Sequence, residues 1–216
     1  MIHAIRSPEI FILRDEADPA VVWHGFNQTW FHTSWQRRSG CGPTAVASAV
    51  YYLRRTRRLP GAEQPFSQSE CRALMEDVWK YVTPTLHGIP SANMLVDGAR
   101  AYFRARSLPV RADTLDIPAR RQDRPAMSGL LDFLAGGLDG DMPVAFLNLN
   151  SGREKTLDSW HWVPLIRLQD GPDRIARADI LDEGLVKTVN LTRWYGTTTL
   201  GGGFVRFFDS RLAAGM

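Results

Sequence analysis

The chain has 216 residues, of which 44% are apolar, 10% aromatic and 23% charged. This composition is typical of a globular protein that buries its own core and needs no disulfide or metal to hold it. The only cysteines are Cys41 and Cys71, with no CxxC pair, which excludes a disulfide framework and a zinc motif and favours a reducing compartment. We predict no cofactor and no metal.

The net charge of +3 is small, and the basic residues are mostly scattered. One cluster, Arg54, Arg55, Arg57 and Arg58, has two interpretations: a nucleic-acid contact, or the solvated last turn of a helix. We favour the helix end, because no base-stacking aromatics alternate with these arginines. We therefore expect no nucleic-acid partner.

The N-terminal segment lacks a basic region followed by an apolar core, so we do not expect a signal peptide. No apolar stretch approaches the roughly 18 residues of a membrane span. These features predict no membrane span and a cytoplasmic protein.

Helical signals dominate residues 36–140. The first clear helix is predicted to begin at Cys41, with Pro43 at an early position where its missing N–H costs nothing, and to run to about Arg57, before Pro60 and Gly61. Three further helices are predicted, one after the capping box of Ser67 and Glu70, one after Ser91 and one from Met127 to Leu138. Cys71 falls in the second of these four helices, where it is expected to be a small buried residue.

Strand signals dominate residues 141–210. The segments PVAFLNL, HWVPLIRL, RIARADIL, VKTVNL and GGFVRFF give at least five candidate strands joined by short turns. Such strands form antiparallel meanders rather than βαβ units. The sequence therefore predicts an α+β fold, with a helical part followed by an antiparallel sheet.

Cys41 has the surroundings of a reactive thiol. It lies between Gly40 and Gly42, which allow unusual backbone angles and close approach of a substrate. The N-terminus of the helix favours a thiolate and supplies free N–H groups to an oxyanion. A buried structural cysteine is the alternative interpretation.

A nucleophilic thiol needs a base, and the base needs a group that orients it. His161 is the preferred base, because it opens a strand between Trp160 and Trp162; His24 and His32 are second choices. Asp182, at the end of the next strand, is the preferred orienting group, with Asp179 as the fallback. The two aspartates should point to opposite faces of the strand, so that only one meets His161.

An amide side chain upstream of the nucleophile is the expected second oxyanion donor. Gln36 lies five residues before Cys41 and Gln28 lies thirteen before it, and the nearer one is preferred. The aromatic segment from Trp23 to Trp35 has two interpretations, as the lining of a cleft or as core packing against the first helix.

Gly-Cys-Gly-Pro-Thr-Ala at the start of a helix of small residues, with an upstream Gln and a downstream His and Asp on strands, resembles the papain-like cysteine peptidase superfamily. The likeness is greatest to the double-glycine leader peptidases of bacteriocin exporters and their stand-alone bacterial relatives. It is concentrated in about 25 residues around Cys41 and does not explain residues 60–140. The exporter peptidases usually carry Asp before the cysteine, where this chain has Gly40, and their Gln usually lies six residues before it.

The resemblance implies a single papain-like domain over residues 1–216. It assigns the nucleophile to Cys41, the proton shuttle to His161, the orienting group to Asp182 and the oxyanion hole to Gln36 and the Cys41 N–H. The expected function is thiol-dependent hydrolysis of a peptide or amide bond in a peptide or amide substrate. Two alternatives stay open: an acyl or peptidyl transferase with the same site, as in the phytochelatin synthases, and an inactive papain-like binding module.

Overall fold

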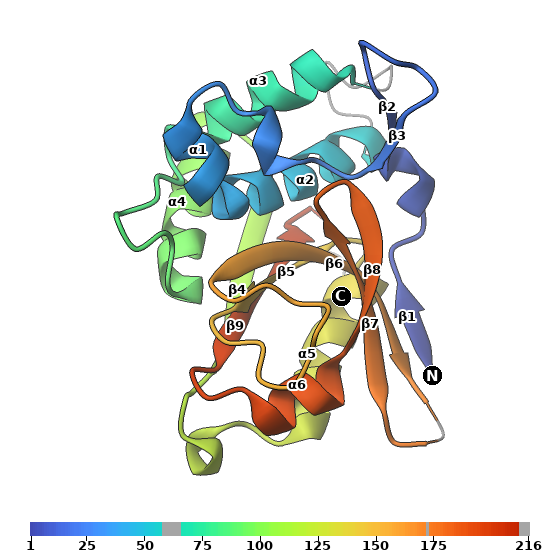
Figure 1. Cartoon of the computed structure of the whole chain (residues 1–216), viewed down its shortest axis with the longest axis vertical. Helices are drawn as coiled ribbons and strands as arrows, with labels where there is room; N and C mark the ends of the chain where they lie inside the picture. Colours follow the sequence, from blue (N-terminus) through green and yellow to red (C-terminus); the bar gives the residue numbers. More distant parts are fainter. Residues whose placement is uncertain (58–65, 172, 212–216) are drawn as a thin grey trace.

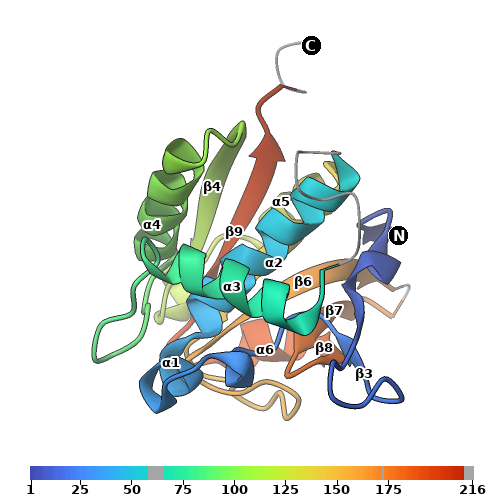
Figure 2. The ribbon, with the colours of Figure 1, turned by 90° about the horizontal axis from the view of Figure 1, so that it is seen from above.

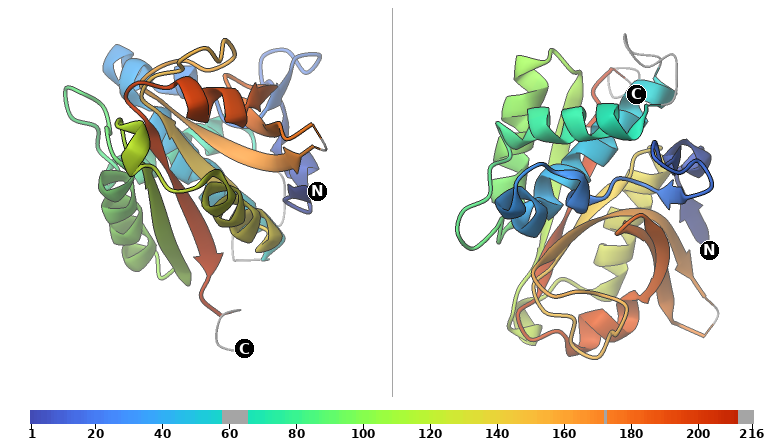
Figure 3. Two further views of the ribbon diagram at one scale, coloured as in Figure 1. Left: turned by 90° about the horizontal axis from the view of Figure 1, so that it is seen from below. Right: turned by 45° about the horizontal axis from the view of Figure 1, so that its top comes forward.

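A computed structural model describes residues 1–57, 66–171 and 173–211 of the chain (Figure 1). Within this part, an antiparallel sheet of seven strands has the order β4-β9-β5-β6-β7-β8, and β1 pairs with β6 outside this path. The strands are β1 (Ile2–Ala4), β4 (Val110–Ile117), β5 (Val144–Asn148), β6 (His161–Asp170), β7 (Ala176–Asp182), β8 (Leu185–Asn190) and β9 (Gly202–Asp209). The sheet curves strongly, as Figure 3 shows, and the predicted α+β class is confirmed.

The meander predicted from the short connections is confirmed for β5 to β8, which pair in chain order. β9 departs from it, because it returns to the free side of β5 and pairs there with both β5 and β4. Gly202 opens this strand at a point where an added Cβ would lie 2.0 Å from the Leu147 carbonyl oxygen. A glycine at this position therefore allows the start of β9 to lie close against β5.

The four predicted helices are present, as α2 (Cys41–Thr56), α3 (Gln68–Trp79), α4 (Ala92–Ala105) and α5 (Met127–Asp139). Ser67 and Glu70 form the predicted capping box of α3, and Ser91 caps α4. The predicted helix stop at Pro60 and Gly61 lies outside the described residues.

Several elements were not predicted. A short helix α1 (Ser34–Ser39) leads through Gly40 into α2, so Cys41 does not open the first helix. α6 (Leu191–Thr197) lies within the β part and β4 within the helical part. The remaining elements are a small hairpin of β2 (Ile12–Arg14) and β3 (Val22–His24), and the 3₁₀ turns η1 (Pro8–Phe11), η2 (Gln28–Trp30) and η3 (Arg121–Asp123).

Helix α2 occupies the centre of the molecule. It lies between α3 and the sheet, contacting β5 and β6, as Figures 1 and 2 show. Twelve of its sixteen residues are buried, including Val46, Tyr51, Tyr52 and Leu53. A helix that is apolar nearly all round belongs to a core, and its position fixes Cys41 against the sheet.

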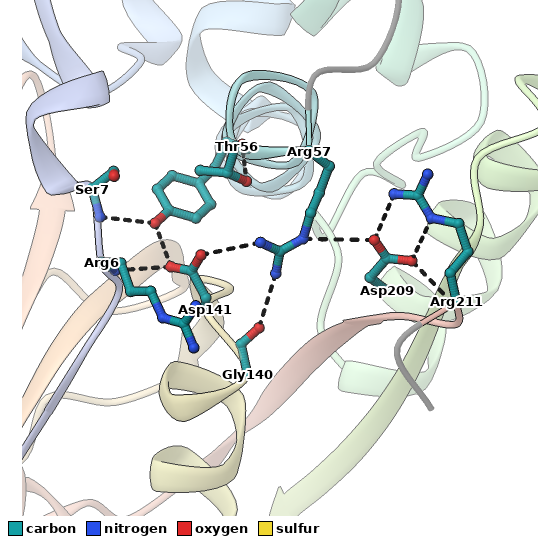
Figure 4. Close-up of polar contacts among 9 residues, drawn as sticks. Arg6, Ser7, Thr56, Arg57, Gly140, Asp141, Asp209 and Arg211 are labelled. Carbon is teal, nitrogen blue, oxygen red and sulfur yellow. Dashed lines mark hydrogen bonds and ion pairs between the residues drawn. The ribbon is translucent and has the colours of Figure 1, made fainter. Parts of the chain in front are cut away.

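A buried polar cluster secures the other end of α2 (Figure 4). The carboxylate of Asp141 accepts hydrogen bonds from the Tyr52 hydroxyl at 2.5 Å and the Arg6 N–H at 2.8 Å. Arg57 pairs with Asp141 at 3.2 Å and with Asp209 at 3.6 Å. The arginines were predicted to be solvated, and for Arg57 this is wrong, because its side chain is only 17% exposed; Arg58 lies outside the described residues.

None of the helices in the described residues combines the length and apolar character that crossing a membrane requires.

Candidate active site

Cys41 is the first residue of α2 and is partly buried at the end of a cavity. Pro43 has no N–H, and the N–H of Thr44 already donates to the Gly40 carbonyl at 2.9 Å. The N–H groups of Cys41 and Gly42 are therefore the donors of this first turn that have no partner within the helix.

Gly40 and Gly42 are needed for space. Gly40 has φ −83°, which any residue adopts. An added Cβ there would lie 2.4 Å from the Phe31 ring and 2.5 Å from the Gln36 carbonyl oxygen, and one on Gly42 would lie 2.7 Å from Ile89. The expectation that these glycines provide unusual backbone angles is wrong; they let the chain's own residues approach the start of α2.

His161 begins β6 and lies between Cys41 and Asp182. Its Nε2 is 2.8 Å from Asp182 Oδ1, and the ring also hydrogen-bonds to the Cys41 thiol. Because Nε2 is taken by the aspartate, Nδ1 is the nitrogen left for the sulfur. Burial disfavours the charged ring, but the hydrogen bonds to Asp182 and Cys41 outweigh it and raise the pKa of His161 to about 10.

Asp182 ends β7, and its side chain is 3% exposed. Burial alone raises the pKa of such a carboxyl group, but the hydrogen bond and charge of His161, together with Lys187, lower it below the usual value. Lys187, on the neighbouring strand β8, places its Nζ 2.7 Å from Asp182 Oδ2. Asp182 therefore contacts a basic group through each oxygen.

The structure thus brings together three of the four residues selected from the sequence, Cys41, His161 and Asp182. The fallback Asp179 lies elsewhere on β7, where it accepts hydrogen bonds from Arg167 at 3.2 Å and from Thr188 at 2.7 Å.

Gln36 belongs to a helix cap in this structure. Its Oε1 accepts hydrogen bonds from the N–H and hydroxyl groups of Thr33, which completes a capping box at the start of α1. It is not among the residues that line the cavity beside Cys41. The other candidate, Gln28, donates from Nε2 to the Arg37 carbonyl at 3.1 Å.

The cavity next to Cys41 has a volume of about 300 Å³. Its lining includes Trp35 and Arg38 from α1, Trp160 and Trp162 from the start of β6, and residues 86–89. Trp162 is buried and donates from its indole N–H to the Ile89 carbonyl at 2.8 Å, which ties the 86–89 turn to the sheet. Trp160 is 55% exposed.

The aromatic segment from Trp23 to Trp35 divides between its two interpretations. Phe26 and Phe31 are buried, and Phe26 packs on Tyr51 of α2 with ring centroids 5.3 Å apart. Trp35 lines the cavity. Most of the aromatic side chains of this segment pack in or against the core, and the last one, Trp35, lines the cleft.

The remaining thiol and histidines differ in surroundings from Cys41 and His161. Cys71 is fully buried, and burial raises the pKa of its thiol. His32 lies 3.6 Å from Glu76 at an exposed position, and His3 bonds to Asp139 at 2.9 Å. His87 lines the cavity.

In the described part of the chain, one group of acidic side chains lies close enough to share a metal ion: Asp158, Asp182 and Glu183. The ammonium group of Lys187 forms ion pairs with two of these carboxylates, at 2.7 Å from Asp182 and 3.4 Å from Glu183. A lysine thus supplies the positive charge among these carboxylates.

Sequence reasoning missed Asn148, a buried polar residue beside His161 in the sheet. Asn148 of β5 pairs in register with His161, donates to the Asp158 carbonyl at 2.7 Å and accepts from the Trp194 indole at 2.8 Å. A polar residue within an apolar strand segment is the signal in the sequence that marks it as hydrogen-bonded in the core.

No protein-family model matches this chain, and no curated protein sequence matches it.

Proposed function

We propose that the chain is a thiol-dependent hydrolase of peptide or amide bonds with a papain-like site. The observation that supports this most is the position of the His161 ring, which contacts the Cys41 thiol with one nitrogen and Asp182 with the other. A nucleophile, a base and an orienting group in this order are the parts that acyl transfer requires.

In the proposed resting state, Cys41 is a thiolate and His161 an imidazolium. A ring whose pKa is about 10 is protonated at neutral pH, and a positive charge beside a thiol at a helix N-terminus favours the thiolate. Asp182 stabilises the imidazolium and holds the orientation of its ring.

Acylation begins when the Cys41 sulfur attacks the scissile carbonyl carbon and forms a C–S bond. The negative charge on the carbonyl oxygen is stabilised by the Cys41 N–H. His161 gives its proton to the leaving nitrogen as the C–N bond breaks, which leaves a thioester and a neutral ring.

In deacylation, neutral His161 accepts a proton from water while the water oxygen attacks the thioester carbon. The C–S bond then breaks, a carboxylic acid leaves and the thiolate–imidazolium pair is restored. No metal or cofactor is required for any step.

Selective alkylation tests the proposal. Iodoacetamide at neutral pH, followed by peptide mapping, is expected to label Cys41 at least about tenfold faster than buried Cys71, and His161→Ala is expected to slow the labelling of Cys41. Equal, slow labelling of both cysteines would contradict the proposal. Turnover of peptide mixtures with and without hydroxylamine then separates water from an amine as the acyl acceptor.

A further inference from the structure

We propose, resting on the hydrolase function above, that the cleft selects peptides that carry a bulky apolar side chain beside a carboxylate. The apolar group would lie on the tryptophans of the cavity, and the carboxylate would pair with Arg38. The observations behind this are the chemistry of the cavity lining and the exposed guanidinium of Arg38, which has no protein partner among the described residues.

The guanidinium group of Arg38 has no ion-pair partner at the site among the residues that the structure describes. It lines the cavity from the last turn of α1, three residues before Cys41, and its side chain is exposed. It forms no hydrogen bond or ion pair with any residue in the described part of the chain. Its neighbour Arg37, in contrast, donates to the Phe31 and His32 carbonyl groups.

Apart from the Cys41 thiolate of the proposed resting state, Arg38 is the charged side chain in the described cavity lining. Arg38 and His87 are its ionisable groups besides the Cys41 thiol, and the described lining includes neither Asp nor Glu. An arginine at a concave and mostly apolar surface attracts an oppositely charged ligand more strongly than it would on an open surface. A planar guanidinium matches a carboxylate through two parallel N–H donors.

The apolar part of the cleft contains a residue in an unfavourable backbone conformation. Trp160 has φ +58°, a left-handed conformation that favours glycine and costs free energy for a bulky residue. Trp160 is nevertheless 55% exposed at the cavity, next to His161 in sequence, and Leu86, which also lines the cavity, is 88% exposed. Apolar side chains exposed around one cavity are typical of a binding surface.

Four alkylating reagents separate the two parts of this preference. These are the N-iodoacetyl derivatives of glycine amide, glycine, phenylalanine amide and phenylalanine, which carry neither group, the carboxylate, the aromatic ring or both. Each rate at Cys41 is divided by the rate with free 2-mercaptoethanol to remove intrinsic reactivity.

The doubly substituted reagent is expected to react fastest. We expect the carboxylate to accelerate labelling about fivefold, less at high salt, and the aromatic ring about tenfold. Arg38→Gln should abolish the carboxylate preference and keep the aromatic one. Trp160→Ala should do the reverse, and Trp35→Ala provides a second aromatic variant if Trp160→Ala does not fold.

Arg120→Gln is the matched control, because it removes one exposed arginine outside the cavity lining. The inference is overturned if the wild type shows no carboxylate preference, if Arg120→Gln reduces it as much as Arg38→Gln, or if Arg38→Gln slows all four reagents equally. Failure of the proposed function is distinguishable, because His161→Ala would then leave the rates of all four reagents at Cys41 unchanged.

Discussion

Lys187 Nζ lies 2.7 Å from Asp182 Oδ2, across the pair of neighbouring strands β7 and β8. The aspartate that orients His161 is thereby itself held by a lysine. Two opposite contacts on one carboxylate restrict its rotation, and the restriction passes to the imidazole ring. Lys187 is a positioning residue for the proposed site.

Replacing these two partners is expected to have unequal effects. Asp182→Asn removes the charge that stabilises the imidazolium and should slow the alkylation of Cys41 at pH 6 by about tenfold. Lys187→Met removes only the outer support and should slow it by about fivefold or less. The pH profile of the iodoacetamide rate measures both.

Lys187→Arg should restore the rate lost in Lys187→Met, while Lys80→Met, at an exposed pair with Asp77, serves as the control. A larger effect for Lys187→Met than for Asp182→Asn would contradict this order of importance.

Stability should fall as the pH rises toward 10. The pKa of His161 is raised in the folded chain to about 10, from 6.5 when unperturbed. Its contribution is therefore fully present below pH 6.5 and is lost as the pH rises through about 10. Asp182, whose pKa is lowered, stays ionised over this range. Urea unfolding at pH 6, 8 and 10 measures the slope.

The Asp182→Asn variant isolates this contribution from other groups that titrate at high pH, such as the buried tyrosines. It should lose less stability than the wild type between pH 6 and 10. Parallel curves for the two proteins would show that the His161–Asp182 pair is not the source of the slope.

Gln36 offers a test between capping and catalysis. Gln36→Glu keeps the capping box with Thr33, because Glu is equally suited to this position, but it removes the N–H donors of the amide. We expect unchanged stability and retained turnover for Gln36→Glu, and a loss of about 1 kcal/mol in unfolding free energy for Gln36→Ala. Loss of turnover in a stable Gln36→Glu protein would instead support a role for Gln36 as a donor in the oxyanion hole.

Gly40→Ala should destabilise the chain through overpacking. The new methyl group would meet the Phe31 ring at 2.4 Å and the Gln36 carbonyl oxygen at 2.5 Å, and the backbone oxygen cannot move freely. We expect a loss of about 2 kcal/mol in unfolding free energy. Gly129→Ala on α5, where an added Cβ meets nothing within 4 Å, is the control and should not destabilise.

We expect the polar cluster of Figure 4 to stabilise the fold without affecting the reactivity of Cys41. Asp141→Ala leaves Arg57 and the Tyr52 hydroxyl without their carboxylate and should cost about 3 kcal/mol in unfolding free energy. Tyr52→Phe should cost about 1 kcal/mol. Both variants should keep the wild-type rate of Cys41 alkylation below their unfolding transitions, since the cluster lies at the opposite end of α2 from Cys41.

Local signals in the sequence were sufficient for much of the fold. The starts of α2, α3 and α4 followed from a proline and from capping residues, whereas α5 was predicted without a capping residue, and the strands β5 to β8 followed from apolar runs between turns. The hairpin, β4 and the short helices α1 and α6 were missed. Helix α1 carries a local signal, the capping box of Thr33 and Gln36, whereas a strand with a distant partner has no such local signal. β4, for example, exists through its eight register pairs with β9.

The sequence by itself determined which chemistry was available: a cysteine at a helix start, a histidine opening one strand and an aspartate closing the next. Only the tertiary structure decided which of these groups meet, because α2 and β6 approach each other across a separation of 120 residues. In the folded chain, Gln36 forms part of a helix cap, and Lys187 contacts the carboxylate oxygen of Asp182 that His161 does not contact. Contacts of this kind depend on where side chains point after packing, which periodicity and spacing along a chain do not encode.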